Sequence, residues 1–309
     1  MDSYFPRLFM KRIKAIWELM RLEHGVMLAL AIFIGSIISL QTTAGLTLSD
    51  FPADKFVLTF FVALFLEAST FALNDYFDLA IDKANKRYDR PLVRGDINPK
   101  TALYIFMILF PLGIILSYFV NLTCFVIALI TALFAIVYDG ILKKIKLLGN
   151  FYIAYVMAIP FVFGAAAVQS SNAFLQPLDP AVIIIALIAF LAGSGREIMK
   201  DVMDFEGDKK QGVKSFPSYI GKRWSNGIAS LFYITAVGLS LLPFLQSFYT
   251  VYYNNIVYLG IVLLTDILLI FTSGQLLFNT HINLAFYRKL TLLAIFFGLL
   301  SFFLGAFIG

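Results

Sequence analysis

Nine long apolar stretches run through this chain of 309 residues, and they constrain its fold more than any other feature. A transmembrane helix needs about 20 mostly apolar residues, and each stretch has close to that length. Only 14% of the residues are charged, against about 25% in a soluble domain. We therefore predict an all-α membrane protein that forms a single domain over residues 1–309, with a basic cytoplasmic N-terminal segment at 1–15. The predicted spans cover residues 24–40, 56–77, 101–119, 121–138, 147–169, 180–200, 226–245, 255–273 and 288–308.

Positive charge falls almost entirely on one side of the predicted spans. Of the 24 Lys and Arg residues, all except Lys55 lie before the first span or in segments on that same side. The positive-inside rule makes this side cytoplasmic, so an odd number of spans places the N-terminus inside and the C-terminus outside. Nucleic acid is a poor partner for charge held at a membrane, whereas the lipid bilayer or a phosphate-bearing substrate suits it.

One acidic pattern, D-x-x-D-x-x-x-D, occurs twice, each time at the cytoplasmic end of a predicted span. Residues at i, i+3 and i+7 share a helix face, so each copy directs three carboxylates one way. Carboxylates at a helix C-terminus are disfavoured by the helix dipole and by one another, so they need a cation. A solvated rim of mixed charge is the simpler explanation, but it does not require a repeated spacing. The first motif is Asp75, Asp78 and Asp82, preceded by Asn74, and the second motif is Asp201, Asp204 and Asp208.

Carboxylate clusters of this kind suit Mg²⁺, which keeps several waters and is commonly completed by substrate phosphates. We therefore expect Mg²⁺ as the cofactor and a diphosphate as its ligand. Basic residues near the motifs can neutralise a departing diphosphate, and Lys143 and Lys144 at the end of the fourth span are candidates, although topology alone would also explain them. The expected metal ligands are Asn74, Asp78, Asp82, Asp201, Asp204 and Asp208.

The two motifs, in this order on a nine-span chain, resemble those of the UbiA superfamily of intramembrane prenyltransferases. The similarity extends to Asp89-Arg90-Pro91-Leu92, to Tyr138 through Lys144, and to Gly195 through Asp201. It implies a helical barrel around a central cavity, with a cytoplasmic cap over the metals and a lateral opening to lipid. It also implies transfer of an isoprenyl group from an isoprenyl diphosphate to a lipophilic acceptor.

The resemblance assigns roles to individual residues of this chain. Catalysis is expected from Asp78, Asp82, Asp204, Asp208 and Lys143. Substrate binding is expected from Asn74, Asp75, Arg90, Tyr138, Lys144, Lys200 and Asp201.

Three further residues are candidates for binding the acceptor. Glu67 lies seven residues before Asn74, on the metal-facing side of the predicted helix, and a charge at membrane depth is functional by default. Arg21 and His24 open the first span from the cytoplasmic side, where they could meet an anionic acceptor. A hydrogen bond between helices is the alternative for Glu67, and a satisfied interfacial position is the alternative for His24.

Two sequence segments favour different acceptors. The run from Arg196 to Asp208 resembles the archaeal branch that alkylates geranylgeranylglyceryl phosphate, and we favour this acceptor because the match is the longer one. The run from Arg21 to His24 is more similar to branches that prenylate aromatic acids in quinone synthesis. A membrane transporter is the alternative from another class, but its acids would lie at the membrane midplane on broken helices.

Overall fold

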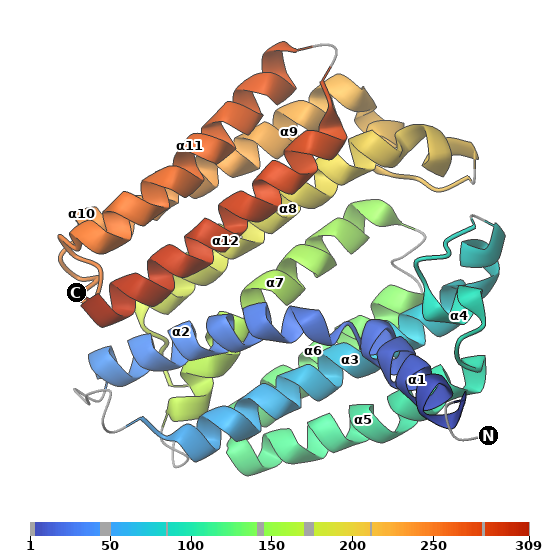
Figure 1. Ribbon diagram of the computed structural model, residues 1–309. Helices are drawn as coiled ribbons and strands as arrows, with labels where there is room; N and C mark the ends of the chain where they lie inside the picture. Colours follow the sequence, from blue (N-terminus) through green and yellow to red (C-terminus); the bar gives the residue numbers. More distant parts are fainter. Residues whose placement is uncertain are drawn as a thin grey trace. The chain divides into compact units, whose positions relative to one another are not determined.

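The computed structural model describes residues 4–43, 51–84, 86–140, 145–169, 176–210, 212–279 and 282–308. These residues form helices and contain no β-strand, as predicted. In chain order the helices are α1 (Tyr4–Met20), α2 (Gly25–Thr43), α3 (Ala53–Ala84), α4 (Pro91–Arg94), α5 (Pro99–Val120), α6 (Leu122–Gly140), α7 (Lys146–Val168), α8 (Pro180–Lys210), α9 (Phe216–Ser240), α10 (Leu242–Leu245), α11 (Ile256–Phe278) and α12 (Leu284–Ile308), with a 3₁₀ turn at Leu22–His24 (Figure 1).

Nine of the described helices are long and apolar enough to cross a membrane, which confirms the predicted number of spans. Asn121 separates α5 from α6, which correspond to the predicted spans 101–119 and 121–138, and its side-chain oxygen accepts a hydrogen bond of 2.8 Å from the backbone N–H of Cys124. This bond caps the first turn of α6. The protein is therefore a multi-pass membrane protein. Its third and fourth spans are joined by a single residue.

Helices α3 and α8 extend well beyond the predicted spans 56–77 and 180–200. Their 32 and 31 residues correspond to about 48 and 46 Å at 1.5 Å per residue, whereas the hydrocarbon core is about 30 Å thick. No Gly or Pro interrupts α3, so the helix continues to Ala84. Each acidic motif consequently lies near the C-terminal end of a helix that is longer than the hydrocarbon core is thick.

The helices form two compact units, each of which has its own packing. The first unit comprises Met1–Ala29 and Ala53–Asp139, and the second comprises Leu30–Pro52 and Gly140–Gly309. In the first unit, α3 packs along α5, and α1 contacts both α3 and α4. The buried apolar residues where α1, α3, α4 and α5 meet are Ala15, Leu19, Ala72, Leu92, Ile97 and Ala102.

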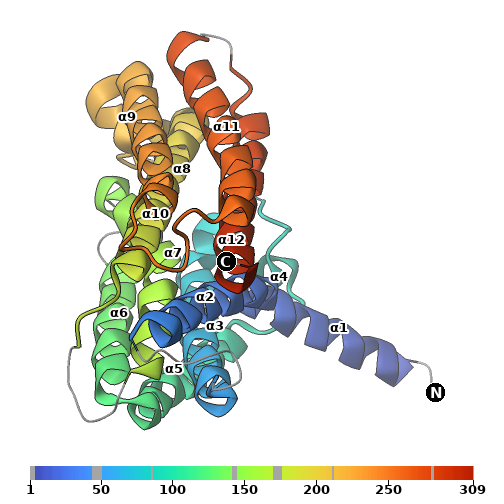
Figure 2. The same cartoon turned by 90° about the vertical axis from the view of Figure 1, so that its left-hand side faces the viewer.

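In the second unit, α8 packs against α7, α9 and α12. Helix α11 packs against α9 and α12 (Figure 1, Figure 2). The second motif thus lies on a helix that is packed between α7, α9 and α12.

Helices α2 and α7 touch backbone to backbone at two glycines of the second unit. A Cβ added at Gly35 would lie 2.0 Å from the carbonyl oxygen of Phe161, and one added at Gly164 would lie 2.0 Å from that of Ile32. Ser36 adds a hydrogen bond of 2.9 Å from its hydroxyl to the Gly164 carbonyl oxygen. Membrane helices approach this closely only where small residues remove the side chains between them.

Helix α1 occupies most of the segment that was expected only to be basic. Its buried face, Ala15 and Leu19, packs against the other helices of the first unit, while Phe9, Ile13 and Trp17 are exposed at i, i+4 and i+8. An exposed apolar stripe next to basic residues is typical of a helix lying in a membrane interface. Arg21 follows α1 with a left-handed backbone, φ 49°, and separates it from α2.

Candidate active site

The first motif brings two predicted substrate-binding arginines to its leading aspartate. Asp75 is only 2% exposed, and its Oδ1 accepts hydrogen bonds from Arg21 Nη2 at 3.1 Å and from Arg90 Nη1 at 2.8 Å. Arg90 Nε also lies 3.9 Å from Asp89 Oδ2, which is more exposed. Two guanidinium groups therefore converge on one buried carboxylate oxygen, which suits the binding of an anionic substrate group.

The surroundings of Arg21 disfavour its positive charge. Burial lowers the pKa of the Arg21 guanidinium, and the neighbouring Arg90 lowers the pKa further. The guanidinium carbon also lies 4.2 Å from the centroid of the Phe71 ring, within cation–π distance. A bound anion would relieve the repulsion between the two arginines.

Two of the three acceptor candidates, Glu67 and His24, lie beside this cluster. His24 Nδ1 lies 3.9 Å from Glu67 Oε1, and the His24 ring packs edge-on against Phe71 with 5.5 Å between centroids. Glu67, Phe71 and Asp75 are spaced i, i+4 and i+8 on α3, so Arg21 and His24 face one stripe of that helix. The sequence identified both residues but did not indicate that they touch.

Asn74 is oriented by a residue that the sequence analysis did not select. Its side-chain nitrogen donates a hydrogen bond of 2.9 Å to Asp139 Oδ1, from the end of α6 next to Tyr138. The remaining carboxylates of the motif differ in burial, since Asp78 is half-buried and Asp82 is buried. In the sequence, the feature that could have indicated Asp139 is its position directly after Tyr138.

The second motif also has a buried leading aspartate. Asp201 is 3% exposed, and its Oδ2 accepts hydrogen bonds from Asn150 Nδ2 at 2.8 Å and from the backbone N–H of Phe216 at 3.2 Å. Lys146 Nζ lies 3.8 Å from Asp201 Oδ1 and 2.6 Å from Asp208 Oδ2. Asn150 and Lys146 were not predicted, although Lys146 shares a basic segment with Lys143 and Lys144.

The other basic residues that were predicted to act in the site are Lys200, Lys143 and Lys144. Lys200 Nζ lies 3.0 Å from Glu197 Oε2, and Arg196 Nη1 lies 3.3 Å from the other oxygen of Glu197. Lys200 is thus bound to a buried carboxylate of its own helix. Lys143 and Lys144 lie outside the described residues, so their roles stay predictions.

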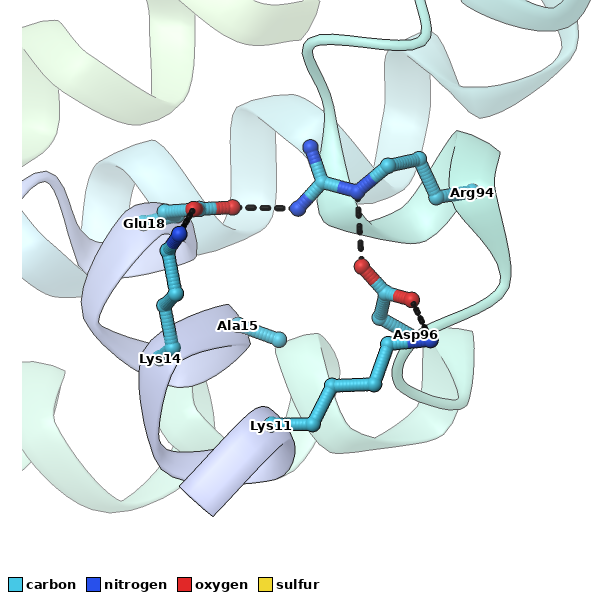
Figure 3. A pocket seen from close by; sticks show the side chains of 6 residues that line it. All are labelled: Lys11, Lys14, Ala15, Glu18, Arg94 and Asp96. Atoms are coloured by element: carbon cyan, nitrogen blue, oxygen red, sulfur yellow. Dashed lines mark hydrogen bonds and ion pairs between the residues drawn. The ribbon is translucent and has the colours of Figure 1, made fainter. Parts of the chain in front are cut away.

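A charged network joins α1 to the segment that carries Arg90. Asp96 accepts hydrogen bonds from Lys11 at 2.8 Å and from Arg94 at 2.6 Å, and Arg94 also pairs with Glu18 (Figure 3). Lys11 and then Arg94 hold the pKa of the Asp96 carboxyl below its usual range. These side chains, with Lys14 and Ala15, line a pocket of about 290 Å³. Because its charges are paired with one another, the network ties α1 to α4.

The sequence comparison decides the family. Residues 32–281 match the profile of the UbiA prenyltransferase family. The chain belongs to that family. The digeranylgeranylglyceryl phosphate synthase of Archaeoglobus fulgidus is 40% identical over 96% of both chains. The synthase of the same name from Methanococcoides burtonii is 36% identical over 95% of this chain and 100% of its own.

Solved structures agree with this assignment. The UbiA enzyme superposes with a TM-score of 0.76 on a structure described as giving insights into digeranylgeranylglyceryl phosphate synthase in membranes, with 34% identity over 96% of this chain and 98% of the other. A UbiA homologue from Archaeoglobus fulgidus, solved with GPP and Mg²⁺, has a TM-score of 0.54 and 19% identity over 93% and 99% of the chains. The second similarity supports the fold alone. The expected all-α membrane fold and the prenyltransferase activity are confirmed, which argues against the transporter alternative.

The UbiA enzyme supplies donor atoms that fit Mg²⁺. Within the described ranges, no three His, Cys, Asp or Glu side chains lie close enough to form a metal site by themselves. Mg²⁺ prefers oxygen donors and commonly binds one or two carboxylates together with waters and substrate phosphates. The carboxylates of the motifs and the Asn74 side-chain oxygen fit an ion of this kind.

Proposed function

We propose that this UbiA enzyme transfers a geranylgeranyl group from geranylgeranyl diphosphate to geranylgeranylglyceryl phosphate. The observation that carries the proposal is the 40% identity to the Archaeoglobus fulgidus synthase over 96% of both chains. The convergence of Arg21 and Arg90 on one buried carboxylate supports a substrate that carries a phosphate. An aromatic acid is the second candidate acceptor, favoured by the run from Arg21 to His24.

Mg²⁺ is proposed as the cofactor, as in the homologue solved with GPP and Mg²⁺. When bound, it neutralises charge that the diphosphate gains as the allylic C–O bond breaks. The candidates to hold it are Asn74, Asp78 and Asp82 in the first motif and Asp201, Asp204 and Asp208 in the second.

The chain's own residues have separate tasks in the transfer. Arg21, Arg90 and Lys146 would bind phosphate oxygens, because fixed cations stabilise charge that develops on a leaving group. Lys143 and Lys144 are proposed for the same task. Aromatic side chains near the site, such as Phe71 beside Arg21, would shield the allylic cation and exclude water from it.

The acceptor is proposed to bind beside Glu67 and His24, which lie 3.9 Å apart. Its nucleophilic oxygen forms the new bond to the allylic carbon, the diphosphate leaves, and the acceptor oxygen loses its proton. Both motifs are proposed to lie on the cytoplasmic side, because nearly all the Lys and Arg residues lie on that side of the spans.

A competition assay tests the acceptor. The purified enzyme receives labelled geranylgeranyl diphosphate, Mg²⁺, and equal amounts of geranylgeranylglyceryl phosphate and an aromatic acid, and mass spectrometry identifies the products. We expect digeranylgeranylglyceryl phosphate, and no product after addition of EDTA. Prenylated aromatic acid without ether lipid would overturn the proposed acceptor and leave the reaction class intact.

A further inference from the structure

The leading aspartates of the two motifs make the same long-range connection. Asp75 accepts a hydrogen bond from Arg90, and Asp201 accepts one from the backbone N–H of Phe216. In each case the donor lies 15 residues after the aspartate. In each unit, therefore, the helix runs past its motif, ends, and the chain returns to bind the leading aspartate.

The two leading aspartates are the most deeply buried carboxylates of the motifs. Asp75 and Asp201 are 2% and 3% exposed and Asp82 is 9% exposed, whereas Asp78, Asp204 and Asp208 are half-buried. The second oxygen of Asp75 is itself buried and has no hydrogen-bond partner among the described residues. Mg²⁺ gives up its waters reluctantly, so a hydrated ion would have to displace protein to reach either leading carboxylate.

Each leading aspartate also holds a cation that belongs to the site. Asp75 fixes Arg21 and Arg90, and Lys146 lies between the leading Asp201, at 3.8 Å, and the trailing Asp208, at 2.6 Å. Removing one partner from a buried, hydrogen-bonded ion pair is strongly destabilising. Such a carboxylate therefore fixes the positions of its partners.

We propose that Asp75 and Asp201 are positioning residues, which close the segment after each motif onto its own helix and hold the phosphate-binding cations, and that they are not metal ligands. The metal ligands are then the trailing carboxylates and Asn74. The role of the cations rests on the proposed function, whereas loop closure and metal binding can be measured without any acceptor.

The first measurement is hydrogen exchange on the full-length protein in detergent, without metal. Asp75→Asn is expected to raise exchange in residues 86–98, and Asp201→Ala is expected to raise it at residues 212–216, including the Phe216 amide that loses its acceptor. The matched controls Asp78→Asn and Asp204→Asn lie on the same helices and should leave both segments unchanged. Should Asp75→Asn fail to fold, Arg90→Gln removes the partner instead, and unchanged exchange at 86–98 would overturn the proposed closure.

The second measurement is Mn²⁺ binding, followed by electron paramagnetic resonance with inorganic pyrophosphate present. Asp75→Asn and Asp201→Ala should retain the Mn²⁺ dissociation constant within about threefold, while Asp78→Asn and Asp204→Asn weaken it by about tenfold or more, as expected for a lost ligand. In turnover, Asp75→Asn should raise KM for the substrates more than it lowers kcat. Loss of Mn²⁺ affinity in Asp75→Asn equal to that in Asp78→Asn would overturn the proposal. If the proposed acceptor is wrong, only the competition assay with the wild-type enzyme would show it. The exchange and Mn²⁺ measurements on the aspartate variants would be unaffected.

Discussion

Asn74 Nδ2 donates a hydrogen bond of 2.9 Å to Asp139 Oδ1, and this contact orients the amide of a predicted metal ligand. An ionised carboxylate only accepts hydrogen bonds, so it selects the nitrogen end of the amide and leaves the Asn74 oxygen for a metal. Removal of such a supporting partner typically weakens metal binding about 10- to 100-fold.

We therefore predict that Asp139→Ala weakens Mn²⁺ binding by at least about tenfold. Asp139→Asn, which keeps an acceptor oxygen, should have a smaller effect. Electron paramagnetic resonance of Mn²⁺ measures both variants. Wild-type affinity in Asp139→Ala would show that the orientation of Asn74 does not matter for the metal.

Asp78→Ala and Asp204→Ala should each abolish turnover while the protein remains folded. Both residues belong to the repeated acid pattern, one on α3 and one on α8. Asp54→Ala is the matched control, because Asp54 is an exposed acid in the first turn of α3, far along the helix from the motif. Turnover by either motif variant within about tenfold of wild type, or about 1.4 kcal/mol of barrier, would contradict metal binding by both motifs.

Gly164→Ala should destabilise the protein by about 1–3 kcal/mol, since the new Cβ would collide with backbone. The ideal position is 2.0 Å from the Ile32 carbonyl oxygen, and a backbone atom cannot rotate away. Gly260→Ala in α11 is the control, because a Cβ there meets nothing within 4 Å. Thermal unfolding in one detergent compares the two. Equal stability of both variants would mean that α2 and α7 are not in close contact.

Trp17 should lie in the membrane interface. Its side chain is exposed on the same face of α1 as Phe9 and Ile13. The chain has two Trp residues, so Trp224→Phe leaves Trp17 as the reporter. In vesicles, lipids brominated near the headgroup should quench Trp17 more strongly than lipids brominated deep in the acyl chain. Fluorescence insensitive to both lipids would place this face of α1 in water or against protein.

Acid should loosen residues 86–98, which join α3 to α5 and contain α4. A hydrogen bond from Arg87 is the largest factor that lowers the pKa of Asp89 to about 2, and Lys11 and Arg94 lower that of Asp96. A lowered carboxyl pKa stabilises the fold above the unfolded value of about 4, and this stabilisation is lost as the pH falls through the folded value.

Hydrogen exchange of residues 86–98, normalised to the intrinsic rate at each pH, should therefore be constant from pH 7 to about 5 and rise from about pH 4 towards 2. Asp96→Asn should be less protected at pH 7 and should change less on acidification. Protection lost in the wild-type protein already above pH 5 would assign the transition to other groups.

Several features could be predicted from the sequence because they depend on local properties. Span number follows from runs of apolar residues, and the break at Asn121 follows from the lengths of the runs on either side. The motifs follow from the helical spacing of Asp75 to Asp82 and of Asp201 to Asp208. The family assignment follows from these same residues, and each of these predictions was confirmed where the described part of the chain tests it.

The partners of the site residues depended on the tertiary structure. Asp75 and Asp201 look equivalent to Asp78 and Asp204 in the sequence, yet only the leading pair is almost completely buried. Their partners lie 15 to 54 residues away. Burial and pairing arise where distant segments pack together, and no local pattern specifies which segments meet. For the same reason Asp139, Lys146 and Asn150 became recognisable only when α6 and α7 were placed beside the helices that carry the motifs.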